Sequence, residues 1–161
     1  MAVHKLILDA DFDDADYTLI GIHCNIEDYR LAYLLNKKLN ISLARKRSDL
    51  DGGNGKTGFS IFEWEDAKRL ITWSLVSNTC KNEIVHQGNQ KSLFDAQEKI
   101  IQTTYLIPEF KAVNYFLKIE NECSESNETY ILNKIVEIPQ IATAFGVDSD
   151  QLKSKHNLIF S

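Results

Sequence analysis

The sequence predicts one α+β domain over residues 1–161, built on an antiparallel or mixed sheet with helices packed mainly on one face. The first observation behind this prediction is the length of 161 residues, which suits a single core. The second is the composition, 43% hydrophobic with 7 Gly and 2 Pro, which supplies apolar surface to bury and lacks a disorder signature. The third is the order of the segments, in which strand, helix and strand patterns follow one another twice.

The first strand–helix–strand unit begins at residues 17–24, whose apolar and β-branched side chains predict a central strand. Asn25 is placed as an N-cap for a helix over residues 26–39, in which leucines recur at steps of three and four residues. Asn40 is placed to end this helix. Residues 41–47 then follow as a second strand.

A β-hairpin is predicted next. Residues 48–58 read as a polar loop, and residues 59–65 and 69–79 read as two strands joined by a tight polar turn. Aromatic and β-branched side chains recur on both strands, so Trp64 could lie against Trp73 as a cross-strand pair. A hairpin that exposes tryptophan could also pair with a second copy of the chain, so a homodimer is one expectation.

The segment after the hairpin is polar. Residues 81–91 predict an exposed loop, and residues 92–101 predict a short helix capped by Ser92. Residues 103–106 predict a strand, and Pro108 marks the turn that follows it.

The second strand–helix–strand unit fills the rest of the chain. Residues 113–120 alternate as a strand does, residues 128–138 predict a helix, and residues 141–147 return as a strand. The tail over residues 149–161 predicts one helical turn and an apolar end docked on the core. Two such units with an added hairpin suggest a ferredoxin-like arrangement.

Charge and hydropathy exclude several classes of protein. The net charge of -5 argues against binding of nucleic acid through the overall field. No apolar run approaches the roughly 20 residues that a bilayer requires, and the first residues lack the apolar core of a signal peptide. The 3 cysteines lie far apart, as reduced and buried thiols do. We therefore expect a cytoplasmic protein without membrane contact.

Two segments resemble ligand-binding loops but fail at a defining residue. Residues 52–58 contain the Gly-Lys-Thr ending of a phosphate loop, but the first glycine of that motif falls on Leu50. Residues 9–16 resemble the start of a calcium loop, but Asp14 and Ile20 stand where that loop requires glycine and glutamate. We therefore expect a connecting loop and a solvated acidic turn, with no cofactor and no metal.

Four cations could contact an anionic partner, namely Arg45, Lys46, Arg47 and Lys56. Successive cations on a strand point to alternating faces and do not form one phosphate-binding surface. An edge strand protected by charge is therefore favoured for residues 45–47, and a nucleic-acid partner is not.

No catalytic signature is readable. The 4 histidines are dispersed, and the sequence contains no GxSxG or HExxH pattern. Because no nucleophile, base and orienting group stand at readable positions, we assign no catalytic residue, and the sequence favours a protein that is not an enzyme.

The segment Ile107-Pro-Glu-Phe-Lys-Ala-Val-Asn-Tyr115 resembles the signature of the IPExxxDY family of bacterial proteins. The motif residues are Ile107, Pro108, Glu109, Asn114 and Tyr115. Stretches over most of the chain are similar to family features, among them residues 27–33 and 152–160. The resemblance implies a bacterial, cytoplasmic protein and brings no assigned activity with it. The motif aspartate is Asn114 here, which argues against a general base or metal ligand, because both roles require a carboxylate.

The motif has a structural and a binding interpretation. Pro108 can set a bend, Glu109 can accept backbone amides, and Tyr115 can bury its ring while its hydroxyl finds a partner. For the whole chain, we favour a non-enzymatic interaction or regulatory protein with a protein partner. The alternative is a small-molecule-sensing domain with a pocket between sheet and helix. An RNA- or nucleotide-associated protein acting through Arg45 and Lys56 is the least favoured function.

Overall fold

The computed structural model describes residues 17–52, 58–85, 99–121 and 125–160. The acidic run of residues 9–16, Lys56 and most of the predicted helix over residues 92–101 lie outside these residues. The strands are β1 (Tyr17–Cys24), β2 (Ala44–Arg45), β3 (Leu50–Asp51), β4 (Gly58–Phe59), β5 (Ile61–Asp66), β6 (Ile71–Ser77), β7 (Thr79–Val85), β8 (Lys99–Tyr105), β9 (Tyr115–Glu120) and β10 (Ile141–Val147). The helices are α2 (Asp28–Leu39) and α3 (Glu125–Val136), with 3-10 helices η1 (Pro108–Phe110), η2 (Ser149–Gln151) and η3 (Lys155–Leu158).

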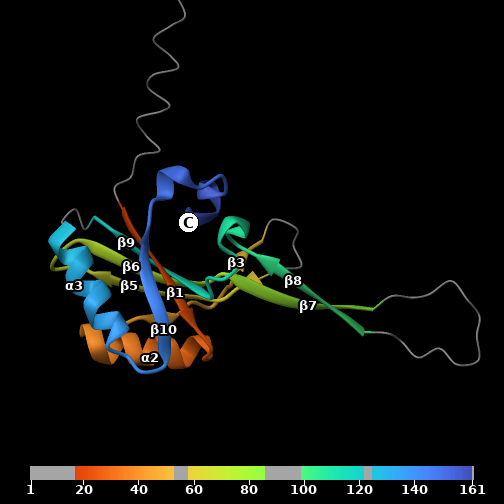
Figure 1. Ribbon diagram of the computed structural model, residues 1–161, viewed down its shortest axis with the longest axis horizontal. Helices are drawn as coiled ribbons and strands as arrows, with labels where there is room; N and C mark the ends of the chain where they lie inside the picture. The colour runs from red at the N-terminus through yellow and green to blue at the C-terminus, as the bar shows by residue number, and fades with distance from the viewer. Residues whose placement is uncertain (1–16, 53–57, 86–98, 122–124, 161) are drawn as a thin grey trace, which may run out of the picture.

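Six strands form one sheet in the order β10-β1-β9-β6-β5-β2, and each pair of neighbours is antiparallel. Since β1 is antiparallel to both β9 and β10, these two strands run parallel to each other with β1 between them. The chain passes from β9 to β10 through α3 (Figure 1). The second predicted strand–helix–strand unit is therefore confirmed as a crossover around β1.

In the first predicted strand–helix–strand unit, the second strand differs between the prediction and the structure. Instead of a strand over residues 41–47, only β2 forms, at the edge of the sheet and separated from β1 by three strands. One reason is local: Leu43 N donates to Asn36 Oδ1 at 2.8 Å, and Asn36 Nδ2 donates to Leu43 O at 3.0 Å. The backbone groups of Leu43 are thereby satisfied by a side chain of α2, so residue 43 does not join a strand ladder.

Helix α2 begins two residues later than predicted. Its N-cap is Glu27, with φ -67° and ψ 154°, and not Asn25. Its end is confirmed, because Asn40 takes the left-handed conformation at φ 56° and donates its N–H to Asn36 O. None of the helices in the described residues is long and apolar enough to cross a membrane.

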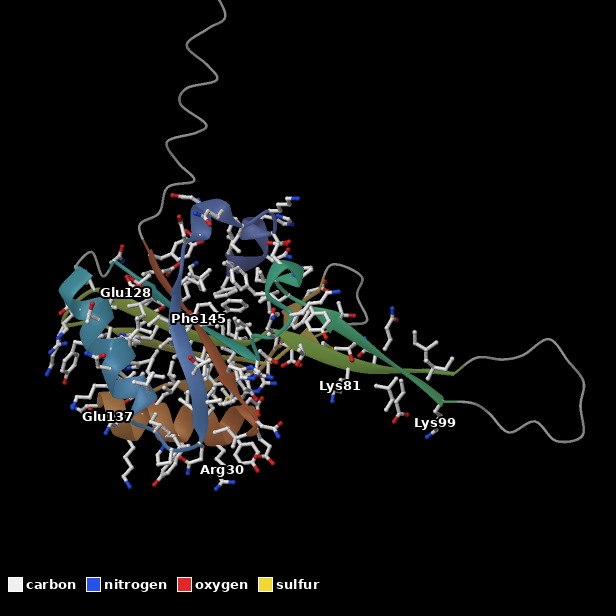
Figure 2. All side chains as sticks on the ribbon, in the orientation of Figure 1. Arg30, Lys81, Lys99, Glu128, Glu137 and Phe145 are labelled. Carbon is white, nitrogen blue, oxygen red and sulfur yellow. The ribbon has the colours of Figure 1, made fainter. Side chains whose placement is uncertain are left out.

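The sheet carries a core on each face. We call the first the helix-side core, because α2 and α3 both pack on it, with Leu31, Leu35, Ile131 and Ile135 against the strands. Figure 2 shows Glu137 at the end of α3 that lies beside α2, and its carboxylate is 2.6 Å from Lys38 Nζ. Two helices thus cover one face of the sheet and are joined by an ion pair.

The opposite face carries the tail-side core, which η1 and the C-terminal residues cover. Its buried residues include Leu19, Phe59, Val76, Ile107, Phe116 and Leu158. Phe145, labelled on β10 in Figure 2, lies opposite Gly21 of β1 and 6.1 Å from the Phe110 ring. A Cβ at position 21 would lie 3.1 Å from the Phe145 ring, so this glycine makes room for the aromatic pair.

The predicted hairpin is confirmed as β5 and β6, and Trp64 lies opposite Trp73 in its register. In its turn, Asp66 Oδ1 accepts the backbone amides of Lys68 at 3.1 Å and Arg69 at 3.3 Å. The predicted strand over residues 69–79 is interrupted at Asn78, which lies between the end of β6 and the start of β7.

The predicted helix over residues 92–101 is wrong where it can be compared, because Lys99, Ile100 and Ile101 begin strand β8. Residues 99–105 include four β-branched side chains and pair antiparallel with β7, a partner that local periodicity does not reveal. Figure 1 shows β7 and β8 extending away from the body as a two-stranded ribbon, with the helices on the opposite side.

Candidate functional site

The predicted motif of residues 107–115 folds as a corner between the ribbon and β9. Pro108 is the first residue of η1, where its fixed φ is compatible with a helix start and no N–H is needed. Ile107 is fully buried in the tail-side core. The corner closes with two backbone bonds, Phe110 N to Ile107 O at 3.1 Å and Val113 N to Phe110 O at 3.0 Å.

A residue outside the motif organises this corner. Asn78 is fully buried, and its Nδ2 donates to Phe110 O at 2.8 Å and to Val113 O at 2.9 Å. Its Oδ1 accepts the N–H of Ile107 at 2.8 Å. The backbone of Asn78 adds bonds to Leu106 and Asn114. One buried side chain therefore satisfies three backbone groups of the motif.

Glu109 connects the corner to the tail. Its carboxylate accepts the hydroxyl of Ser154 at 2.7 Å and the N–H of Ser154 at 3.2 Å. The Ser154 hydroxyl holds the pKa of this carboxyl below its ordinary value. Asn157 Nδ2 donates to Leu106 O at 2.8 Å and makes a second connection. Residues 107–115 and residues 152–160 are thus hydrogen-bonded to each other.

The side chains of Asn114 and Tyr115 bond to the backbone between β1 and α2. Asn114 Oδ1 accepts the N–H of Cys24 at 3.1 Å, and the Tyr115 hydroxyl donates to Ile26 O at 2.7 Å. Burial raises the pKa of the Tyr115 hydroxyl and that of the Cys24 thiol. An aspartate at position 114 could accept the same amide, so an asparagine there keeps the contact.

The motif residues therefore do not converge on one cavity. Glu109 faces the tail, whereas the ring of Tyr115 lies in the helix-side core. Their polar groups bond to the backbone or to Ser154.

The predicted basic residues are also separated. The guanidinium of Arg45 pairs with Asp49 and lies over the Phe62 ring, and Lys46 Nζ is 3.5 Å from Glu63 Oε2. Arg47 is exposed, and Lys56 lies outside the described residues. Arg45 of the edge strand β2 and Lys46 directly after it are both paired with carboxylates, so this edge offers little free positive charge to a phosphate.

The described residues form a partly open cleft of about 650 Å³ where the hairpin turn, the end of α2 and the start of α3 meet. We call it the tryptophan cleft, because Trp64 and Trp73, the only 2 tryptophans of the chain, both line it. Its other lining residues are Leu39, Asn40, Ile41, Glu65, Asp66, Ala67, Lys68, Arg69, Ile71, Asn127, Tyr130 and Ile131.

The floor of the cleft is apolar, and polar and charged residues surround it. Trp73, Ile41, Ile71 and Ile131 are buried, so they form a fixed apolar floor. Tyr130 is 60% exposed and forms an outer wall on α3, with Lys134 Nζ 5.6 Å from the ring centre. A concave apolar surface with a few polar groups is the usual form of a small-molecule site.

The sequence indicates part of this cleft. The cross-strand pair of Trp64 and Trp73 is predictable from alternation, whereas Tyr130 stands in a helix whose position over the hairpin depends on the crossover around β1. Among the described residues no group of three His, Cys, Asp or Glu side chains is placed to hold a metal ion.

Comparison of the chain with models of known families, with curated proteins and with solved structures finds no match.

Proposed function

We propose that this protein is a non-enzymatic regulatory protein that binds a small molecule with an aromatic or apolar body in the tryptophan cleft. The observation that carries the proposal is the cleft of about 650 Å³ with both indoles on its wall. Sites for small organic ligands have volumes of roughly 300–1,000 Å³ and mostly apolar linings. The cleft fits this class of site in size and in its buried apolar floor, whereas six charged or carboxamide residues make its lining more polar than is usual for the class.

The lining supports binding more than catalysis. The described residues that line the cleft include no histidine, cysteine or serine. The Asp66 carboxylate, which could act as a base, already accepts two turn amides and has a side chain only 14% exposed. A group held in this way orients the turn and is poorly placed to take a proton from a ligand.

The proposal is tested with tryptophan emission and melting temperature. A metabolite panel and N-acetyl-L-phenylalaninamide, a neutral aromatic probe, are titrated into the protein. Since both tryptophans line the cleft, an occupant should change the emission. At a hundred times its dissociation constant it should also add about 2.7 kcal/mol of stability. The proposal is wrong if no compound moves both signals.

Two exposed tyrosines on helices provide a matched pair of variants. Tyr130, 60% exposed, lines the cleft, whereas Tyr29, 65% exposed, lies on α2 outside it. We expect Tyr130→Ala to weaken binding about two- to twelvefold, because an aromatic contact contributes about 0.5–1.5 kcal/mol. Tyr29→Ala should leave the affinity unchanged, and equal effects of the two variants would place the ligand elsewhere.

We further propose a cytoplasmic, bacterial protein of the IPExxxDY type, on the resemblance of residues 107–115. We also propose that the order β10-β1-β9-β6, with α2 and α3 on one face, is a ferredoxin-like core to which β5 and β2 are added. The parallel relation of β9 and β10 around β1 supports this interpretation.

A second candidate function is association with another chain through the β7–β8 ribbon, and a separate observation favours it. One face of the ribbon carries the pairs Asn82–Gln102 and Ile84–Ile100 and no charge. The opposite face carries the charged residues, with Lys99 Nζ 3.6 Å from Glu83 Oε2. Figure 2 shows Lys81 and Lys99 on the projecting ribbon.

The uncharged face suits a second copy of this chain. A twofold interface must be complementary to itself, and carboxamides that both donate and accept meet that condition, as do apolar side chains. A chain with a net charge of -5 also approaches its copy most easily through a neutral surface. An isolated two-stranded ribbon is marginally stable in water, which adds a reason for a partner.

The mass in solution tests this candidate. We expect the average mass to rise above 18.4 kDa with protein concentration and Ile100→Glu to abolish the rise. Ile101→Glu is the control, because Ile101 is 63% exposed on the charged face, whereas Ile100 is 45% exposed on the uncharged one. A constant monomer mass at high concentration contradicts the homodimer.

A further inference from the structure

Strand β10 forms one edge of the six-stranded sheet, at the front of the body in Figure 1. In the part of the chain that the structure describes, β10 pairs only with β1. The opposite edge is β2, which has 2 residues and carries Arg45. β10 has 7 residues, Ile141–Val147, and none of them is charged or proline. It therefore lacks the side chains that usually prevent an edge strand from pairing with another chain.

The register shows which backbone groups of β10 are open. Ile22 O accepts the N–H of Asn114 at 3.0 Å, so the backbone groups of Ile22 face β9. In an antiparallel ladder both groups of a residue point to the same side, and the side alternates along the strand. Ala144 lies opposite Ile22, so its N–H and C=O point away from β1, as do those of Gly146 two residues later. The regular register covers residues 143–147, and these two residues offer their backbone groups to an added strand.

A carboxylate without a partner lies beside this open edge. Among the described residues, a Cβ at position 146 would meet only the carboxyl group of Glu128 on α3. Glu128 is half-buried, and its carboxylate forms no ion pair or hydrogen bond with a described residue. Figure 2 labels it on α3 and Phe145 on β10. Phe145 and Val147 are half-buried on the tail side of the strand. An added strand would thus meet a carboxylate on one face and apolar side chains on the other.

We propose that β10 binds an extended segment of a partner protein in which a lysine or arginine stands between two apolar residues. The segment pairs antiparallel with β10, as neighbouring strands of this sheet do. Its cation lies opposite Gly146 and reaches Glu128, because residues opposite each other in a ladder point to the same face. Its apolar residues lie opposite Phe145 and Val147.

The charges favour such a partner over a second copy of the chain. A second β10 would bring no cation to Glu128, because this strand is uncharged. The net charge of -5 attracts a cationic segment and repels a copy of the chain. In this mode of recognition the backbone bonds supply affinity, and the alternate side chains supply specificity.

Peptides that differ in one group test the backbone bonds and the ion pair separately. The probe is acetyl-Thr-Val-Lys-Val-Thr-amide, whose lysine is expected opposite Gly146. One relative has glutamine in place of lysine, and two carry an N-methyl group on the lysine or on the valine after it. We expect the probe, at millimolar concentration, to shift the amide NMR signals of Ala144 and Gly146. Methylation of the lysine N–H, which bonds to Gly146 O, should weaken binding about two- to twelvefold, whereas the valine N–H faces solvent and its methylation should change little.

Protein variants assign the contacts. Glu128→Gln should weaken the lysine peptide about 1.5- to fivefold and leave the glutamine peptide unchanged, as expected for a partly exposed ion pair. Glu65→Gln is the control, because it removes the same charge from an exposed position of β5, which three strands separate from β10. Ala144→Pro removes an outward N–H and should abolish binding of both peptides. If Ala144→Pro does not fold, the two methylated peptides still decide whether the edge pairs.

The results decide between the occupants of the edge. Shifts at Ala144 and Gly146 that weaken with the methylated lysine and with Glu128→Gln support the proposal. Equal affinity of the lysine and glutamine peptides overturns it, as does the absence of shifts in β10 at millimolar peptide. If a higher concentration of the protein alone shifts these amides, a second copy occupies the edge and the proposal is wrong. Tyr130→Ala should leave peptide affinity unchanged, because Tyr130 lines the tryptophan cleft, whose function is tested separately.

Discussion

Replacing Asn78 with leucine is expected to lower the free energy of unfolding by about 2–6 kcal/mol, because each buried backbone group left without a partner costs about 1–3 kcal/mol. The N–H of Ile107 and the carbonyl of Val113 lose their partner, and the carbonyl of Phe110 keeps only the N–H of Val113. A domain of this kind has about 5–15 kcal/mol of stability in total, so the loss is a large part of it. Urea unfolding followed by circular dichroism at 25 °C measures it.

Two further variants keep this prediction testable if Asn78→Leu does not fold. Asn78→Asp retains an acceptor for Ile107 N–H but turns an oxygen toward the carbonyls of Phe110 and Val113. It should therefore destabilise the fold at neutral pH by less than leucine does. Asn133→Leu, at an exposed position of α3, should change stability by no more than about 0.5 kcal/mol. A loss below about 1 kcal/mol for Asn78→Leu would show that the corner does not depend on Asn78.

The importance of Asn78 illustrates what local pattern cannot predict. The sequence places this residue within a predicted strand over residues 69–79, and the only hint is a carboxamide inside an apolar run. Its partners lie 29 to 35 residues away and become its neighbours only when β7 pairs with β8. The motif is visible in the sequence, whereas the side chain that holds it is not.

The elements that the sequence predicts well are those with a local cause. Strand β1, the end of α2 at Asn40, the β5–β6 hairpin and β10 follow from alternation, capping and turn residues. The β7–β8 ribbon does not, because Ile100 and Ile101 suit a helix face as well as a strand until their partners are known. The tryptophan cleft is likewise not predictable from local pattern, because two of its three walls are helices whose positions depend on the order of strands in the sheet.

The partners of Lys118, on the opposite face of the sheet, are likewise not predictable from local pattern. It stands in the centre of β9, is 5% exposed, and donates from Nζ to Leu158 O at 2.7 Å. Glu120 Oε1 lies 2.8 Å from the same ammonium, and the rings of Tyr17 and Phe160 lie 4.7 and 5.0 Å from it. A buried charge satisfied by a carboxylate, a carbonyl and two aromatic faces holds the tail against the sheet.

We therefore expect Lys118→Met to lower the free energy of unfolding by about 1–3 kcal/mol, because the carbonyl of the buried Leu158 loses its charged donor. Methionine keeps the apolar stem, so the loss reports on the ammonium and not on packing. The double variant Lys118→Met/Glu120→Gln should have about the same stability as Lys118→Met, since the Glu120 side chain is 38% exposed and water solvates its carboxylate.

The location of the effect distinguishes a tail anchor from a general loss of stability. In Lys118→Met, the amide of Ile159, which bonds to His156 O, should exchange with solvent faster, whereas amides of α2 keep their relative protection. Carboxypeptidase should also digest the C-terminal residues sooner than in the unaltered protein. Equal acceleration of exchange in the tail and in α2 would mean that Lys118 stabilises the fold as a whole and does not specifically anchor residues 152–160.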